Sequence, residues 1–143
     1  MWSQVERGLV LAFRSIAKIE SYAVAEAIMS ATQSFRGRMK MIDTIIVVEP
    51  LPDKTLAVWK DLKKRLEKCN NERNGLAHFS IVHHTKHKPT DGYALAPLFS
   101  PAISAARGEP LLLTPTEIAE IENRFLQLGG DLQWFERPRV QRR

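Results

Sequence analysis

The sequence predicts an all-α fold, an up-and-down bundle of four to five helices with an irregular insert before the last helix. Apolar residues recur at spacings of three and four over most of the chain, which is the pattern of helices with one buried face. Strand-like alternation is confined to one short segment, and four of the eight prolines lie between residues 89 and 110. At 143 residues the chain is long enough to bury a core of its own.

The first two predicted helices cover residues 2–16 and 21–48. The β-branched run 45–48 could form a short strand, but the unbroken period before it favours a helix that ends before Pro50. Ser21 is the expected N-cap of the second helix. The apolar stripe of the first helix is Trp2, Val5, Leu9, Ala12, Phe13 and Ile16, and that of the second is Ile28, Ala31, Phe35, Met39, Ile42 and Ile46.

The third predicted helix begins at Pro52-Asp53 and leads to Arg73. Its two faces differ sharply in character, as expected for a helix that packs on one side and meets water on the other. The predicted buried face carries Leu56, Trp59, Leu62, Leu66 and Cys69, and the charged face carries Lys60, Lys63, Lys64, Glu67 and Lys68.

The helical period is lost from Phe79 to Pro110. Residues 79–83 alternate weakly and residues 90–93 resemble a turn, so a short β-hairpin is one option within this insert. A long non-helical insert in a small helical protein is more often functional or partner-facing than accidental.

The last predicted helix opens with Thr114-Pro115-Thr116-Glu117, a capping box with proline at the first helical position. We expect the pair Gly129-Gly130 to kink or end this helix. The sequence thus predicts a single helical domain over residues 1–136 and a basic tail over residues 137–143. The helix's apolar stripe is Ile118, Ile121, Phe125, Leu128, Leu132 and Phe135.

The net charge of +5 favours a polyanionic partner such as RNA. Most of this charge lies in the tail, where four arginines fall within the last seven residues. The longest apolar run, residues 39–48, includes two charged residues and is too short to span a membrane. The N-terminus lacks a secretory pattern, and the one cysteine cannot form an internal disulfide. We therefore expect a cytoplasmic protein without membrane contact.

One hexapeptide, Arg73-Asn74-Gly75-Leu76-Ala77-His78, carries the main functional signal. Arginine binds phosphate oxygens through two parallel N–H groups, and histidine transfers protons near neutral pH. On a continuing helix the two side chains would point about 140° apart, whereas a tightened or broken turn at Gly75 would bring them closer. The alternative is an arginine at a helix end and a histidine that packs or caps nearby.

With this motif and the helices around it, the chain resembles the HEPN superfamily of small helical bundles. The hallmark of that superfamily is Arg, a polar residue, a short spacer and His after a long helix, and residues 73–78 match this spacing. The resemblance extends over most of the chain. It includes an opening helix with Trp2 and Glu6, a second with Phe35 and Met39, Trp59 before the motif, a loop with Tyr93 and Pro97, and a capped final helix.

The resemblance implies a metal-independent endoribonuclease that works as a homodimer, with the two motifs facing one cleft. In that scheme His78 is a general base or acid, Arg73 stabilises the transition state, and Asn74 orients the groups or contacts phosphate. The products carry a 2′,3′-cyclic phosphate, and DNA is spared because it lacks the attacking hydroxyl. Relatives also suggest a toxin or defence role with a separate antitoxin chain, although many members only bind or dimerise.

All four histidines, His78, His83, His84 and His87, lie within ten residues. A zinc site would need three of them with a carboxylate such as Asp91, but the spacing matches no specific metal signature, so we expect no metal or other cofactor. His83 and His84, interleaved with Lys86 and Lys88, are instead candidates for a strip that contacts RNA. The alternative function is a non-catalytic helical module that binds RNA or protein, or that dimerises.

The remaining candidates are interpreted as structural. Cys69 lies on an apolar stripe and is expected to be buried as a small hydrophobe. Trp2, Trp59 and Trp134 lie on or beside the stripes and are expected in the core or a dimer interface. Glu72 is expected to form a structural ion pair with a basic group.

Overall fold

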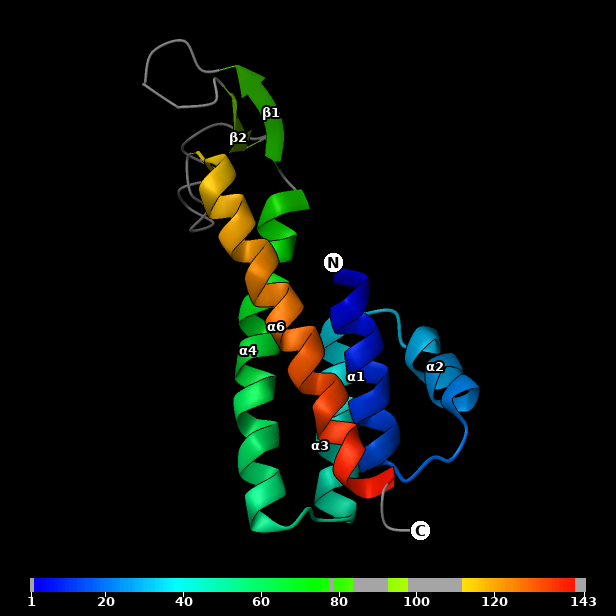
Figure 1. Cartoon of the computed structure of the whole chain (residues 1–143). Coiled ribbons are helices and arrows are strands. Elements are labelled where there is room, and N and C mark those ends of the chain that lie inside the picture. The colour runs from blue at the N-terminus through cyan, green and yellow to red at the C-terminus, as the bar shows by residue number, and fades with distance from the viewer. Residues whose placement is uncertain (1, 78, 84–92, 98–111, 141–143) are drawn as a thin grey trace. The chain divides into compact units, whose positions relative to one another are not determined.

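Five helices and a two-stranded hairpin make up the part of the chain that the structure describes (Figure 1). This computed structural model describes residues 2–77, 79–83, 93–97 and 112–140. The fold is all-α apart from the hairpin, which confirms the predicted class. The elements are α1 (Trp2–Ile16), α2 (Tyr22–Ala31), α3 (Phe35–Val48), α4 (Asp53–Ala77), β1 (Phe79–His83), β2 (Tyr93–Pro97) and α6 (Pro115–Val140).

The contacts divide the chain into two compact units. The first unit comprises Met1–Lys68 and Phe125–Arg143, and the second comprises Cys69–Arg124. The two long helices α4 and α6 each contribute one part to either unit. The prediction of one domain over residues 1–136 therefore stays a prediction.

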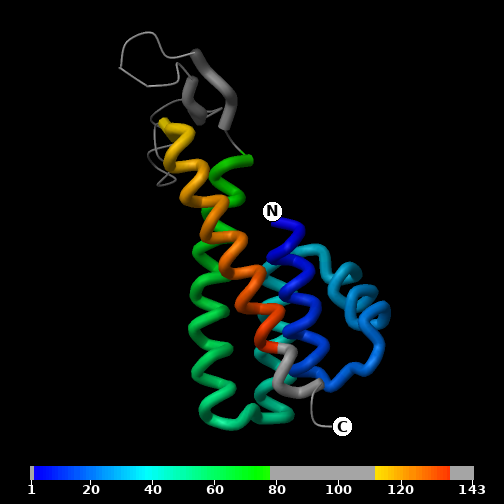
Figure 2. The backbone as a smooth tube through the Cα atoms, in the orientation of Figure 1, coloured from blue at the N-terminus to red at the C-terminus, as the bar shows by residue number. Residues whose placement is uncertain are grey.

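The core of the first unit contains buried side chains from all five helices, and α2 packs against α1. Figure 2 shows the chain turning at residues 49–52, so that α3 and the first part of α4 run in opposite directions. Most of the apolar side chains that the three-and-four spacing predicts for α1, α4 and α6 are buried, together with two from α3. They include Val5, Leu9, Ala12, Phe13, Ile16, Met39, Ile42, Trp59, Leu62, Leu66, Phe125, Leu128 and Leu132.

Two glycines allow α1 and the C-terminal part of α6 to approach closely. A Cβ on Gly8 would lie 2.8 Å from Leu132 Cβ and 2.9 Å from the carbonyl oxygen of Gly129, and one on Gly129 would lie 3.2 Å from the backbone of Gln4. Gln4 thus lies beside Gly129 and Gly8 beside Leu132, so the two helices run in parallel here. The predicted end at Gly129-Gly130 is wrong, because α6 continues to Val140, and Gly129 packs against α1 instead. The other option, a kink at this pair, stays a prediction.

The predicted helix over residues 21–48 is also wrong, because it is two helices. Ser21 caps α2 as expected, accepting a hydrogen bond from the backbone N–H of Val24. The helix then stops at Thr32, and Ser34 starts α3 by accepting from Gly37 N at 3.0 Å. Arg38 stabilises the break by donating Nε to the carbonyl oxygen of Thr32 at 2.9 Å.

The end of α1 has the geometry of a Schellman motif. Ile19 N donates to Arg14 O at 3.0 Å, and Lys18 N donates to Ser15 O at 3.4 Å. Lys18 lies between these bonds with φ of 55°, in the left-handed region that glycine adopts most easily. The motif turns the chain from α1 toward α2.

The hairpin β1–β2 lies in the predicted insert. Its strands pair antiparallel from Phe79 opposite Pro97 to His83 opposite Tyr93. Pro97 has no backbone N–H and stands at the end of the ladder, where the loss of a donor costs least. The other residues of the insert, 84–92 and 98–110, lie outside those that the structure describes.

Candidate functional site

The motif begins inside α4. Arg73 and Asn74 are exposed residues of this helix, which continues through Gly75 to Ala77. Of the two options for Gly75, a continuing helix and a tightened or broken turn, the structure has the continuing helix up to Ala77. His78, which completes the motif, lies outside the described residues.

Arg73 lies on the apolar face of α4. Cys69 precedes it by four residues and Leu76 follows it by three, so the three side chains point within about 60° of one another. Cys69 is buried and Leu76 half-buried, which confirms the expected burial of the cysteine. The apolar stripe of α4 thus includes an exposed guanidinium between Cys69 and Leu76. The spacing of three and four could have predicted this face from the sequence.

Asn74 contacts the arginine beside it. Arg73 Nη1 donates to Asn74 Oδ1 at 3.3 Å. A guanidinium has five N–H groups in a planar fork, and this bond uses one of them. The side chains of Arg73 and Asn74 therefore contact each other on the exposed surface of α4, and the positioning role of Asn74 stays a prediction.

Glu72 connects this part of α4 to α6. Arg124 donates Nη2 to Glu72 Oε1 at 2.8 Å and Nε to Oε2 at 3.3 Å, so the two groups meet in a fork-to-fork arrangement. Glu72 keeps 19% of its side-chain exposure and Arg124 keeps 37%. The expected structural ion pair of Glu72 is confirmed. Its partner, 52 residues away in the sequence, could not be identified from the pattern.

The start of α6 is held by the predicted capping box. Glu117 Oε2 accepts from Thr114 N at 2.8 Å and from Thr114 Oγ1 at 2.9 Å, and Thr114 Oγ1 accepts from Glu117 N at 3.3 Å. The hydrogen bond from the Thr114 backbone, followed by that from its hydroxyl, lowers the pKa of Glu117 below its ordinary value. The box places Arg124 two turns into the helix.

The remaining predicted site residues cannot be placed together. His84, Lys86 and Lys88 lie outside the described residues, as do His87 and Asp91 of the alternative zinc set. His83 is the last residue of β1, opposite Tyr93. Within the described ranges no three histidine, cysteine, aspartate or glutamate residues group as metal ligands do.

Of the three tryptophans, two have the predicted environment. Trp59 is buried, and Trp2 lies half-buried with its ring centroid 5.5 Å from that of Phe125 and 6.5 Å from that of Phe35. Trp134 is 61% exposed, so it does not lie in the core, and the other expected place, a dimer interface, stays a prediction. It lies at a groove between α4 and α6 that the sequence did not reveal.

No helix in the described part of the chain combines the length and apolar character that crossing a membrane requires. The chain matches no protein-family model, no curated protein and no solved structure.

Proposed function

We propose that the chain is a HEPN-like, metal-independent endoribonuclease that acts through Arg73, Asn74 and His78. One observation carries the proposal: Arg73 is exposed on α4 with its guanidinium bonded to Asn74 at 3.3 Å, in a segment that Glu72 ties to α6. An exposed arginine whose side chain already contacts a neighbouring group can bind a phosphodiester with less loss of conformational freedom.

The chemistry needs a base, an acid and a group that stabilises negative charge. His78 takes the proton of the ribose 2′-hydroxyl, or returns one to the leaving 5′-oxygen. The 2′-oxygen attacks phosphorus while the bond to the 5′-oxygen breaks, which leaves a 2′,3′-cyclic phosphate and a free 5′-hydroxyl. Arg73 stabilises the charge that accumulates on the phosphoryl oxygens in the transition state.

The proposal includes partners. Two copies would pair so that both motifs border one cleft, and the RNA would be held in part by His83, His84, Lys86 and Lys88. The net charge of +5 supports a polyanionic substrate. A toxin or defence role in the cytoplasm, restrained by a separate antitoxin chain, belongs to the same proposal.

The test is cleavage of single-stranded RNA by the purified chain in excess EDTA. We compare wild type with Arg73→Ala and His78→Ala, and include two controls. Arg36→Ala removes an exposed arginine of α3, and His87→Ala removes a histidine outside the motif. Circular dichroism and the sedimentation of each variant establish folding and assembly.

We expect cleavage to survive EDTA, to fall about 100-fold or more in both motif variants, and to persist in both controls. A 2′-deoxy residue at the cleaved position should abolish it. Equal cleavage by wild type and motif variants would overturn the proposal, because the activity would come from elsewhere. RNA binding without cleavage would also overturn it, in favour of a non-catalytic module.

A further inference from the structure

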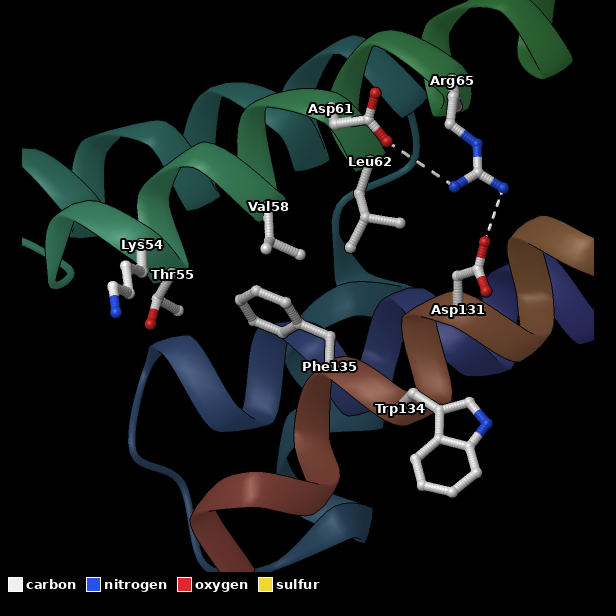
Figure 3. A pocket seen from close by; sticks show the side chains of 9 residues that line it. All are labelled: Lys54, Thr55, Val58, Asp61, Leu62, Arg65, Asp131, Trp134 and Phe135. Carbon is white, nitrogen blue, oxygen red and sulfur yellow. Dashed lines mark hydrogen bonds and ion pairs between the residues drawn. The ribbon is translucent and has the colours of Figure 1, made fainter.

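A groove in the first unit is lined by no residue of the motif. It runs between the start of α4 and the C-terminal part of α6, with a cavity volume of about 470 Å³ (Figure 3). Ligand sites in proteins commonly have volumes of about 300–1,000 Å³ and combine apolar walls with a few polar groups. The groove has both properties.

The middle of the groove is apolar and open. Leu62 is buried at its side, and the ring of Phe135 points toward Val58 and Thr55 (Figure 3). Val58 is 52% exposed and Trp134, at the rim, is 61% exposed. A ligand that covered these two side chains would remove apolar surface from water, which is the main source of affinity at such sites.

One end of the groove is closed by an ion-pair bridge. Arg65 of α4 contacts Asp131 of α6 at 2.6 Å and Asp61 of its own helix at 3.7 Å. The bridge crosses from one wall to the other and already neutralises the arginine. A long partner helix lying along the groove would have to displace it, whereas a compact ligand would not.

The other end carries uncompensated positive charge. Lys54 and Val58 precede Arg65 on the same face of α4, and Lys54 lies about 16 Å from Arg65 along the helix axis. Among the described residues, neither the ammonium of Lys54 nor the hydroxyl of Thr55 has a hydrogen-bond or ion-pair partner. An anionic group placed here would gain a charge-assisted hydrogen bond.

We propose that this groove binds a compact amphipathic monoanion with a flat aromatic body. The aromatic body lies on Val58, Phe135 and Trp134, and the anionic group meets Lys54 and Thr55. The ion pair of Arg65 and Asp131 closes the end of the groove away from Lys54 and so limits the length of the ligand. The site is independent of the proposed nuclease motif.

The probe is 8-anilinonaphthalene-1-sulfonate, a fluorescent aromatic monoanion, titrated into the purified chain. Val58→Asp places a carboxylate in the groove, and Val47→Asp is its matched control, because Val47 is an exposed valine of α3 with 79% exposure. Lys54→Gln removes the cation, and Lys60→Gln removes an exposed lysine of α4 that does not line the groove. The neutral analogue N-phenyl-1-naphthylamine separates charge recognition from apolar binding.

We expect saturable binding of one probe per chain, weakened about tenfold or more by Val58→Asp and unchanged by Val47→Asp. Lys54→Gln should weaken the sulfonate about two- to fivefold and leave the neutral analogue unaffected, while Lys60→Gln changes neither. Equal effects of the two aspartate variants would overturn the proposal. So would a wild-type chain that binds no probe but whose oligomeric state changes with Val58→Asp, which would make the groove a protein interface.

Discussion

Arg124 donates two hydrogen bonds to the carboxylate of Glu72, at 2.8 and 3.3 Å, immediately before Arg73 in the sequence. The pair ties two helices of the second unit together where the proposed motif begins. Breaking it should lower the free energy of unfolding. It should also release the turn of α4 on which Arg73 lies.

The first prediction measures this pair by a double-mutant cycle with Glu72→Gln, Arg124→Gln and the double variant. We expect each single change to cost about 1 kcal/mol and a coupling of about 0.5–1 kcal/mol, since the groups are partly exposed. Urea denaturation supplies the values. Arg36→Gln should change the free energy of unfolding by less than about 0.5 kcal/mol. A coupling of zero would mean that the pair does not hold the helices together.

Two helical glycines should respond in opposite ways to a methyl group. A Cβ on Gly75 meets none of the described residues within 4 Å, whereas one on Gly8 meets Leu132 and the Gly129 backbone within 3 Å. Gly75→Ala should therefore stabilise the chain by about 0.5–1 kcal/mol through helix propensity, and Gly8→Ala should destabilise it by about 1–3 kcal/mol. Thermal melts of the two variants test this. If Gly75→Ala stabilises the chain but abolishes cleavage of RNA, the substrate or a second copy approaches Gly75 closely.

Local signals predicted much of the fold. The stripes of α1, α4 and α6 follow directly from spacings of three and four, and the caps at Ser21 and Thr114 follow from residue type. These features depend on neighbours in the sequence. The pattern therefore identifies them without knowledge of the tertiary structure.

The features that the sequence did not predict depend on competing local signals or on contacts between residues far apart in the sequence. The apolar period runs through residues 28–35, so it concealed the break that Ser34 and Arg38 stabilise. The sequence predicts a kink or end at Gly129-Gly130 because it does not reveal the contact of Gly129 with Gln4 of α1, 125 residues away. The partner of Glu72 and the groove beside Phe135 are likewise tertiary features.

Lys18 offers a test of the turn after α1. A φ of 55° lies in the left-handed region, which is strained for any residue that carries a Cβ but not for glycine. Lys18→Gly should raise the free energy of unfolding by about 0.5–1 kcal/mol, less the small contribution of its exposed ion pair with Glu49. Lys40→Gly, in the interior of α3, should instead lower it by about 1 kcal/mol. Thermal melting of both variants measures these opposite changes in stability. A loss of stability in Lys18→Gly would contradict the turn geometry.

The capping box should make stability depend on pH. The Thr114 backbone holds the pKa of Glu117 below its ordinary value of 4.5, so the charged carboxylate stabilises the folded state above that pH. This stabilisation is lost as pH falls through the lowered pKa. Glu117→Gln should melt about 2–4 °C below wild type at pH 7, and the difference should narrow below pH 4.5. Glu120→Gln, an exposed position in the same helix, is the control, and a difference that does not vary with pH would contradict the prediction.

The last prediction separates charge from geometry at Arg73. Lysine keeps the positive charge but presents a point donor instead of a planar fork, and it cannot repeat both the bond to Asn74 and a two-point contact with phosphate. Arg73→Lys should therefore reduce single-turnover cleavage of RNA by about 100-fold while RNA binding, measured by filter retention, falls by less than about threefold. Arg36→Lys should alter neither measurement. Equal losses of binding and cleavage in Arg73→Lys would show that the arginine only holds the substrate, because a group that acts in the transition state must affect cleavage more than binding.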